Sequence, residues 1–303
     1  MIIVITGPTC TGKSDTALEV AKVFNAEIVN GDAFQCYKEL EIGVAKPPKQ
    51  YFDIVPHHLY SFVKVDECFS IADYQLALRK CVDEIIARGK NVIIVGGSGL
   101  YIRAALYDYI FNNQPKVDMS KYEALTNDEL HTELSKVDPK QATIIHKNNR
   151  KRLLRAIEIY LANGITKSEI IESQEHKLIY NAQFFVRDIE RDELYKLIEK
   201  RVDKMIDEGL LNEVERIAKN YGEKCRSLQA IGYKELIPVI RGEYSLEKGI
   251  ELIKKNSRNY AKRQLTFIRH QFPVKYYKNT ADLLEILKNE RLFRKIKTTS
   301  WRR

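Results

Sequence analysis

Apolar residues follow two different spacings along the first third of the chain. Consecutive apolar residues at 2–5 and 92–95, and a mostly apolar segment at 26–29, are typical of strands buried on both faces. Between them, apolar residues recur at helical spacing at 17–24 and 71–87. Strands that alternate with helices in this way predict the α/β class, with a parallel sheet covered by helices on both faces.

This alternation stops near residue 112. From there to about 181 the pattern contains only helical segments and turn signals, and residues 183–186 again resemble a buried strand. We therefore predict a core domain at 1–112 and 183–303, interrupted by a mainly helical insertion domain at 113–182. Further core helices are expected at 192–207, 211–220, 247–272 and 282–289, with a last strand at 274–277.

A glycine-rich loop follows the first predicted strand and precedes a helix. The loop fits the phosphate-binding pattern GxxxxGK[ST], in which backbone N–H groups and the helix dipole hold phosphate, the lysine neutralises charge and the hydroxyl can bind Mg²⁺. The sequence thus predicts a P-loop NTPase-like core with Mg²⁺ at Ser14, but the phosphorylated ligand stays open. The predicted loop residues are Gly7, Pro8, Thr9, Cys10, Thr11, Gly12, Lys13 and Ser14.

Asp32 comes just after the second predicted strand, where open α/β sheets place ligand-contacting groups. It is a candidate general base or metal partner. An aspartate is also common as a helix N-cap or turn residue, so position alone favours neither role. Together with the loop, it is compatible with kinase-like phosphate chemistry.

The charge of the chain is unevenly distributed. The net charge is +9, and residues 254–303 hold 15 basic and three acidic residues, which leaves −3 for the first 253. The segment 140–155 holds six basic residues and no acid, and helical phasing places Lys255, Arg258, Lys262 and Arg269 on one stripe. Because acids are missing from these stretches, we predict contact with a polyanion, although the same cations could clamp a diphosphate.

Cellular context follows from features that are missing from the sequence. Five cysteines form no CxxC pair, which favours a reducing compartment without structural zinc. No apolar run approaches the roughly 18 residues of a membrane span, and the first residues lack the basic flank of a signal peptide. We expect a cytoplasmic protein that does not contact membranes.

Seven motifs in order resemble those of the tRNA dimethylallyltransferase family. Asp32 opens a DSxQxY-like segment, Ala33 replaces its serine, and Ser98 replaces a threonine in the GGTGLY-like segment. Ala33 lacks the hydroxyl of the family's serine, which weakens the analogy beside the presumed base. Val44, Asn149 and Phe267 are milder departures. The motifs lie at 7–14, 32–47, 56–59, 96–101, 152–158, 229–235 and 260–264.

The resemblance implies transfer of a dimethylallyl group from dimethylallyl diphosphate to N6 of adenosine 37, immediately 3′ of the anticodon, in tRNA. It implies Asp32 as base, with Lys13, Arg103 and Mg²⁺ at Ser14 stabilising the departing diphosphate. A monomer that binds the tRNA anticodon stem-loop is expected. The implied tRNA path comprises Asp32, Ala33, Phe34, Gln35, Ser98, Lys151, Arg152, Arg155, Arg258, Lys262, Arg263 and Gln264.

Three other functions are compatible with the residues themselves. The same fold could prenylate free adenine nucleotides, although so small a substrate would need neither a helical insertion nor long basic segments. A P-loop nucleoside or nucleotide kinase would instead turn over the γ-phosphate of ATP. A non-catalytic RNA-binding P-loop protein would bind tRNA without forming a product.

Overall fold

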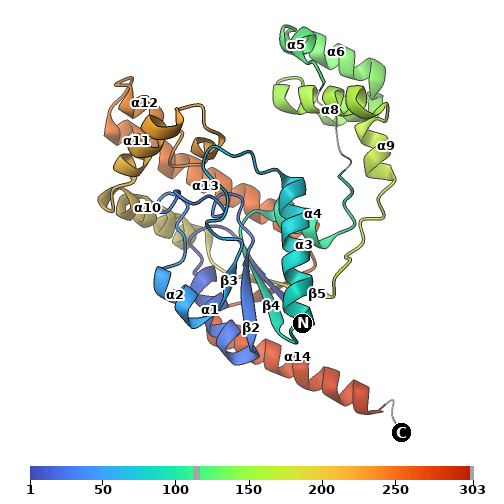
Figure 1. Ribbon diagram of the computed structural model, residues 1–303, viewed down its shortest axis with the longest axis vertical. Helices are drawn as coiled ribbons and strands as arrows, with labels where there is room; N and C mark the ends of the chain where they lie inside the picture. Colours follow the sequence, from blue (N-terminus) through green and yellow to red (C-terminus); the bar gives the residue numbers. More distant parts are fainter. Residues whose placement is uncertain (112–116, 301–303) are drawn as a thin grey trace. The chain divides into compact units, whose positions relative to one another are not determined.

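The computed structural model describes residues 1–111 and 117–300, with side chains to residue 290. Contacts divide the chain into one unit of Met1–Leu106 with Tyr180–Arg303 and a second unit of Tyr107–Ile179 (Figure 1). The sequence analysis placed the boundaries a few residues later on each side. The two segments that enter and leave the second unit pair with each other, Tyr107 with Leu178, which assigns them to that unit.

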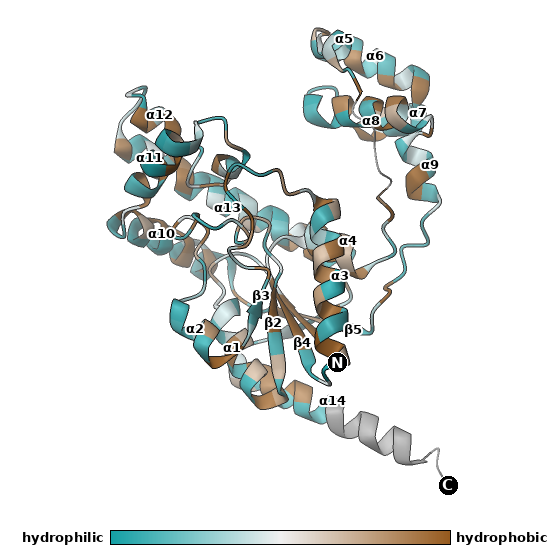
Figure 2. Ribbon diagram, in the orientation of Figure 1, coloured by the Kyte–Doolittle hydropathy of each residue, from teal (hydrophilic) through white to brown (hydrophobic). Residues whose placement is uncertain are grey.

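The first unit is built on a six-stranded parallel sheet of order β3-β2-β4-β1-β5-β6. The central strands β1, β2 and β4 are buried on both faces, which explains their mostly apolar sequences (Figure 2). In β2 the apolar sequence is interrupted by Glu27, which is buried and pairs with His58 and Arg88. This confirms the α/β class. The strands are β1 (Ile2–Thr6), β2 (Ala26–Asn30), β3 (His57–His58), β4 (Asn91–Gly96), β5 (Ala182–Arg187) and β6 (Val274–Tyr277).

Helices cover the sheet on both faces. Residues of α1 (Lys13–Phe24) and α14 (Thr280–Ser300) share one apolar cluster with Ile3 and Ile5 of β1. The helix α3 (Ile71–Ala87) contacts β2, β4 and α4 (Gly99–Leu106) and contributes no residue to that cluster, so it packs on the opposite face (Figure 1). The helix α14 runs well beyond the predicted end at 289.

A second apolar cluster in this unit lies beside the carboxyl ends of the strands. It joins α10 (Arg191–Asp207), α11 (Leu210–Tyr221) and α13 (Leu246–Gln271) to the loop at 36–45. The remaining short helices are α2 (Lys49–Ile54), η1 (Arg226–Gln229) and α12 (Ile237–Ile240). Through this cluster, segments far apart in sequence reach the edge of the sheet where the glycine-rich loop lies.

The second unit is helical and has a core of its own, which includes Leu130, Leu134, Leu153 and Ile157. Thr126 and Thr166 cap α6 and α9 in capping boxes, which fixes where these helices begin. Asn149 precedes α8, but its side chain makes no capping hydrogen bond. The helices are α5 (Ser120–Glu123), α6 (Asn127–Val137), α7 (Pro139–Ile144), α8 (Arg150–Asn163) and α9 (Lys167–Glu172).

Candidate active site

The glycine-rich loop connects β1 to α1 in the conformation that its sequence predicts. Cys10 and Gly12 have φ angles of 66° and 69°, so the backbone turns back on itself before α1 begins. The Thr11 hydroxyl donates to the Pro8 carbonyl at 3.0 Å, and Nζ of Lys13 donates to the same carbonyl at 2.5 Å. These bonds hold the loop ready for an anion at the N-terminus of α1.

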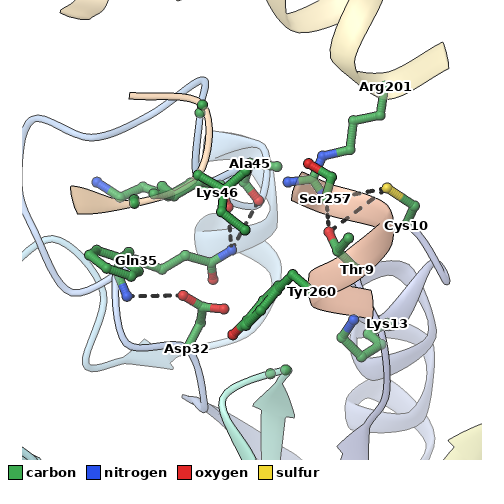
Figure 3. Close-up of a pocket in the computed structure, with 18 of the residues that line it drawn as sticks. Thr9, Cys10, Lys13, Asp32, Gln35, Ala45, Lys46, Arg201, Ser257 and Tyr260 are labelled. Atoms are coloured by element: carbon green, nitrogen blue, oxygen red, sulfur yellow. Dashed lines mark hydrogen bonds between the residues drawn. The ribbon is translucent and has the colours of Figure 1, made fainter. Parts of the chain in front are cut away.

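A cavity of about 540 Å³ opens over this loop. The segments 32–35 and 43–48, the end of β4, and the helices α10 and α13 form its other walls (Figure 3). Eleven predicted site residues line it: Thr9, Cys10, Thr11, Gly12, Lys13, Ser14, Asp32, Phe34, Gln35, Arg263 and Gln264. The loop and the candidate base, 18 residues apart in sequence, therefore face one space.

Asp32 lies at the carboxyl end of β2 in the cavity wall. Desolvation raises the pKa of its carboxyl, and the Phe34 N–H, which donates to it at 2.9 Å, and Lys13 oppose that rise. Tyr260 points toward Asp32 from α13 (Figure 3), and desolvation with the nearby carboxylate raises the pKa of this phenol to about 12. A carboxyl with a raised pKa is better matched to accepting a proton.

Lys13 is one of the basic residues that line the cavity. Desolvation lowers the pKa of its ammonium group to about 8, with Arg201 lowering it further and Cys10 and Asp32 opposing the fall. An anion bound in the loop would restore the full charge of Lys13. The lysine is therefore suited to a ligand that is, or becomes, strongly negative.

Arg201 is a cavity residue that the sequence analysis missed. One terminal guanidinium nitrogen donates to the Thr9 hydroxyl and to Cys10 Sγ, the latter at 3.6 Å. Its buried Nε finds no hydrogen-bond partner among the described residues. The only local signal is a basic residue between the apolar positions Ile198 and Val202 of α10, and its contact with the loop spans almost 200 residues.

Gln264 links three parts of the site. Its Nε2 donates to the Gly97 carbonyl at 2.8 Å, and its Oε1 accepts from the Thr9 N–H at 3.2 Å. A Cβ at Gly97 would lie 2.2 Å from Nε2, so a larger residue there would have to displace the Gln264 amide. The amide that the resemblance assigns to tRNA thus ties α13 to the glycine-rich loop.

Several predicted site residues lie outside the cavity lining. Gly7 and Pro8 form the start of the loop, and the Ala33 N–H donates to the Ser98 hydroxyl at 3.0 Å. Arg103 donates to the Gln271 carbonyl at 2.7 Å from α4. Arg103 is not among the residues that line the cavity, so its role at the diphosphate stays a prediction, whereas Arg201 contacts the loop.

One of the four cations of the predicted stripe on α13 has an acidic partner on the helix α10: Arg258 pairs with Glu199 at 2.5 Å. Lys254, beside the stripe, pairs with Asp203 of α10 at 2.6 Å, whereas Lys262 is exposed. The prediction of a stripe without acidic partners is thus wrong at Arg258, because the acid comes from a different segment of the chain. Of the basic residues at 288–303, all but Lys288 lie outside the side chains that the structure describes.

The basic stretch of the second unit is also partly paired. Lys140 pairs with Glu172, Lys147 with Asp128 and Arg155 with Glu158, at 2.7–2.9 Å. In the described part of the chain, no acidic side chain pairs with Lys151 or Arg152, both exposed on the first turn of α8. Among the described residues of this unit, fewer basic side chains are free of an acidic partner than the sequence suggests.

The donor set fits a magnesium ion that is carried by a phosphorylated ligand. The described residues contain no group of three or more His, Cys, Asp or Glu side chains that could hold a metal alone. Ser14, in the cavity wall, offers one hydroxyl oxygen. Mg²⁺ commonly takes one or two protein oxygens and completes its octahedron with phosphate oxygens and water.

No helix in the described ranges has the length and apolar character needed to cross a membrane. The parallel sheet, a glycine-rich loop at its carboxyl edge that has the sequence pattern of a phosphate-binding loop, and a carboxylate after β2, the next strand along the chain, define an α/β protein with a candidate site at that edge. The family model described as IPP transferase matches residues 35–271.

Relatives and solved structures agree with this match. The tRNA dimethylallyltransferase of Bacillus subtilis is 42% identical over 298 residues, 96% of this chain and 95% of that protein, and the Oceanobacillus iheyensis enzyme of the same name is 43% identical over 290 residues, 94% and 93% of the two chains. The crystal structure of tRNA delta(2)-isopentenylpyrophosphate transferase from Staphylococcus epidermidis has a TM-score of 0.73 at 37% identity and covers 97% of this chain and 99% of that one. A eukaryotic dimethylallyltransferase acting on tRNA has a TM-score of 0.78 at 29% identity, over 92% and 74%. This chain belongs to the IPP transferase family, as its motifs predicted, and it is a transferase.

Proposed function

We propose that this protein transfers the dimethylallyl group of dimethylallyl diphosphate to N6 of adenosine 37, next to the anticodon of tRNA. The proposal is based on one observation: the glycine-rich loop and Asp32 line the same cavity. The names of the relatives favour tRNA prenylation over a nucleotide kinase or a non-catalytic RNA-binding protein.

The allylic C–O bond breaks at the loop. Both electrons of this bond leave with the diphosphate, whose growing negative charge the loop N–H groups, Lys13 and Arg201 stabilise. Mg²⁺, held by Ser14 together with diphosphate oxygens and water, would add charge neutralisation. Desolvation of the cavity strengthens each of these interactions relative to water.

The adenine amine forms the new bond to the allylic carbon. Its lone pair is conjugated with the ring, so the nucleophile improves as a base removes an N6 proton. Asp32 accepts that proton, and its raised pKa suits this role. An adenine stacked in a loop cannot reach Asp32, so we expect the nucleotide to be flipped into the cavity, where Phe34, Gln35 and Arg263 are available to contact it.

The proposal is tested by mass spectrometry of unmodified tRNA incubated with dimethylallyl diphosphate and Mg²⁺. The wild-type protein should add one dimethylallyl group to one adenosine of the anticodon loop. Asp32→Ala should abolish the product and keep tRNA binding, whereas the matched control Asp53→Ala, an exposed acid of α2, should be active. Absence of product with wild type refutes the function, and an unchanged rate in Asp32→Ala refutes the proposed base.

A further inference from the structure

The cavity has two chemically different ends. The glycine-rich loop, Lys13 and Arg201 make one end polar and cationic, whereas Val202 and Met205 of α10 help to make the other end apolar. Four more lining residues belong to the same apolar cluster as Val202 and Met205, namely Val44, Ala45, Ile231 and Ile253; Lys46 and Lys234 also line the cavity. If the proposed function holds, the diphosphate occupies the cationic end and the hydrocarbon chain lies in the apolar end.

The helix α10 sets the length of the apolar end. Arg201 and Met205 are four residues apart on the cavity face, a separation of about 6 Å along the helix axis. Arg201 contacts the loop through Thr9, so Met205 lies about one helical turn beyond the phosphate end. A hydrocarbon chain that starts at the phosphate end would therefore meet Met205 within about one helical turn.

Hydrogen bonds hold the loop at 41–45, which forms the cavity wall opposite α10, in place. The Glu213 carboxylate accepts backbone N–H groups of Ile42 and Gly43 at 3.0–3.3 Å, immediately before Val44 and Ala45. The Tyr233 hydroxyl donates to the same carboxylate at 2.6 Å. These bonds fix the loop at 41–45, so Met205 is the adaptable part of the apolar end.

Met205 also separates the cavity from the apolar core behind it. Its side chain is 7% exposed and belongs to the cluster that contains Val214, Ile217 and Tyr233. Methionine is unbranched and flexible, so its removal opens space without moving the backbone. That space would join the cavity, whereas truncation of a core residue behind it would leave a closed void.

We propose that Met205 sets the length of the isoprenoid that this transferase accepts and excludes allylic diphosphates longer than five carbons. Shortening Met205 should admit the ten-carbon chain of geranyl diphosphate. One misfit methylene in an apolar pocket changes specificity by about 10- to 200-fold. We therefore expect Met205→Ala to raise the ratio of kcat/KM for geranyl over dimethylallyl diphosphate at least tenfold.

The test measures tRNA prenylation with each diphosphate separately, and inhibition of dimethylallyl transfer by geranyl diphosphate. Ile217→Ala truncates a buried residue of the same cluster outside the cavity lining and should gain no geranyl transfer. Met205→Val repeats the test with a smaller loss of packing if Met205→Ala does not fold. The inference alone would be overturned if the wild type already used geranyl diphosphate. It would also be overturned if folded Met205 variants had the same selectivity as wild type and were inhibited by geranyl diphosphate to the same extent. Wild type inactive with dimethylallyl diphosphate would overturn the proposed function and the inference with it.

Discussion

At the scale of single residues, the cavity shifts the pKa values of Lys13 and Asp32 in opposite directions. Desolvation lowers the pKa of Lys13 to about 8 and raises the pKa of Asp32 above its usual value. The proposed reaction requires a charged lysine and an ionised carboxylate. Both are present only between the two pKa values, so the free enzyme should be most competent in that window.

The pH dependence of kcat/KM should therefore be bell-shaped. Below the raised pKa of Asp32 the carboxyl is protonated and cannot accept the N6 proton. Above about pH 8, Lys13 loses its charge and binds diphosphate less well. Bound diphosphate favours the charged lysine, so the basic limb of kcat should lie at higher pH than that of kcat/KM. Steady-state rates across both limbs provide the test, and a coincident basic limb in the two profiles would contradict it.

Replacement of Arg201 should slow transfer through the departing diphosphate. Arg201→Met removes a cation beside the loop, and loss of one such donor costs about 10²- to 10³-fold in rate. Arg201→Lys should recover part of the loss, because charge is restored without the guanidinium geometry. Arg216→Met is the control, since Arg216 pairs with Glu39 outside the cavity. Equal rates for the Arg201 and Arg216 variants would exclude Arg201 from diphosphate stabilisation.

At the scale of elements, one buried carboxylate connects α11 to the cavity. Glu213 is 7% exposed and accepts the backbone N–H groups of Glu41, Ile42 and Gly43 as well as the Tyr233 hydroxyl. Four donors on one carboxylate define the path of a loop that has no regular secondary structure. The cavity wall at 43–45 is thus held from a helix 170 residues away in sequence.

Glu213→Gln should loosen this loop. The amide replaces one acceptor oxygen with an N–H₂ group that faces donors, so the free energy of unfolding should fall by about 2–3 kcal/mol. The KM for dimethylallyl diphosphate should rise because the wall at Val44 and Ala45 is less ordered. Chemical denaturation and steady-state kinetics measure both effects. Glu215→Gln, an exposed acid of the same helix, should change neither; a Glu213 variant that behaves like it would refute the anchoring role.

These elements show what the sequence could and could not predict. Strands β1, β2 and β4 were predictable because burial on both faces leaves short, mostly apolar segments. β3 has two residues, too few for any pattern. The glycine-rich loop and Asp32 carry local signals, whereas Arg201 and Glu213 reach the site through contacts between distant segments. Such long-range contacts leave no local sequence pattern.

At the scale of the whole molecule, the basic charge divides into separate features. Residues 254–303 hold 15 of the basic residues, but Lys254 and Arg258 are paired with acids of α10. In the second unit, Lys151 and Arg152 are exposed without an acidic partner among the described residues. A phosphate backbone gains most from cations that need not first release a partner, so these two, like the exposed Lys262 of α13, are stronger candidates for tRNA contact than Lys254 and Arg258.

This distinction predicts different salt dependences for tRNA binding. Each cation that neutralises a duplex phosphate contributes about 0.9 to the slope of log K against log salt. Lys151→Ala and Arg152→Ala should each weaken binding and reduce the slope by about that amount. Lys140→Ala and Lys147→Ala remove cations already paired with Glu172 and Asp128, so they should change the slope much less. Equilibrium binding of an anticodon stem-loop to the full-length protein at several salt concentrations measures all four. Equal slopes across the four variants would mean that ion pairing within this unit does not decide which cations meet the phosphate backbone.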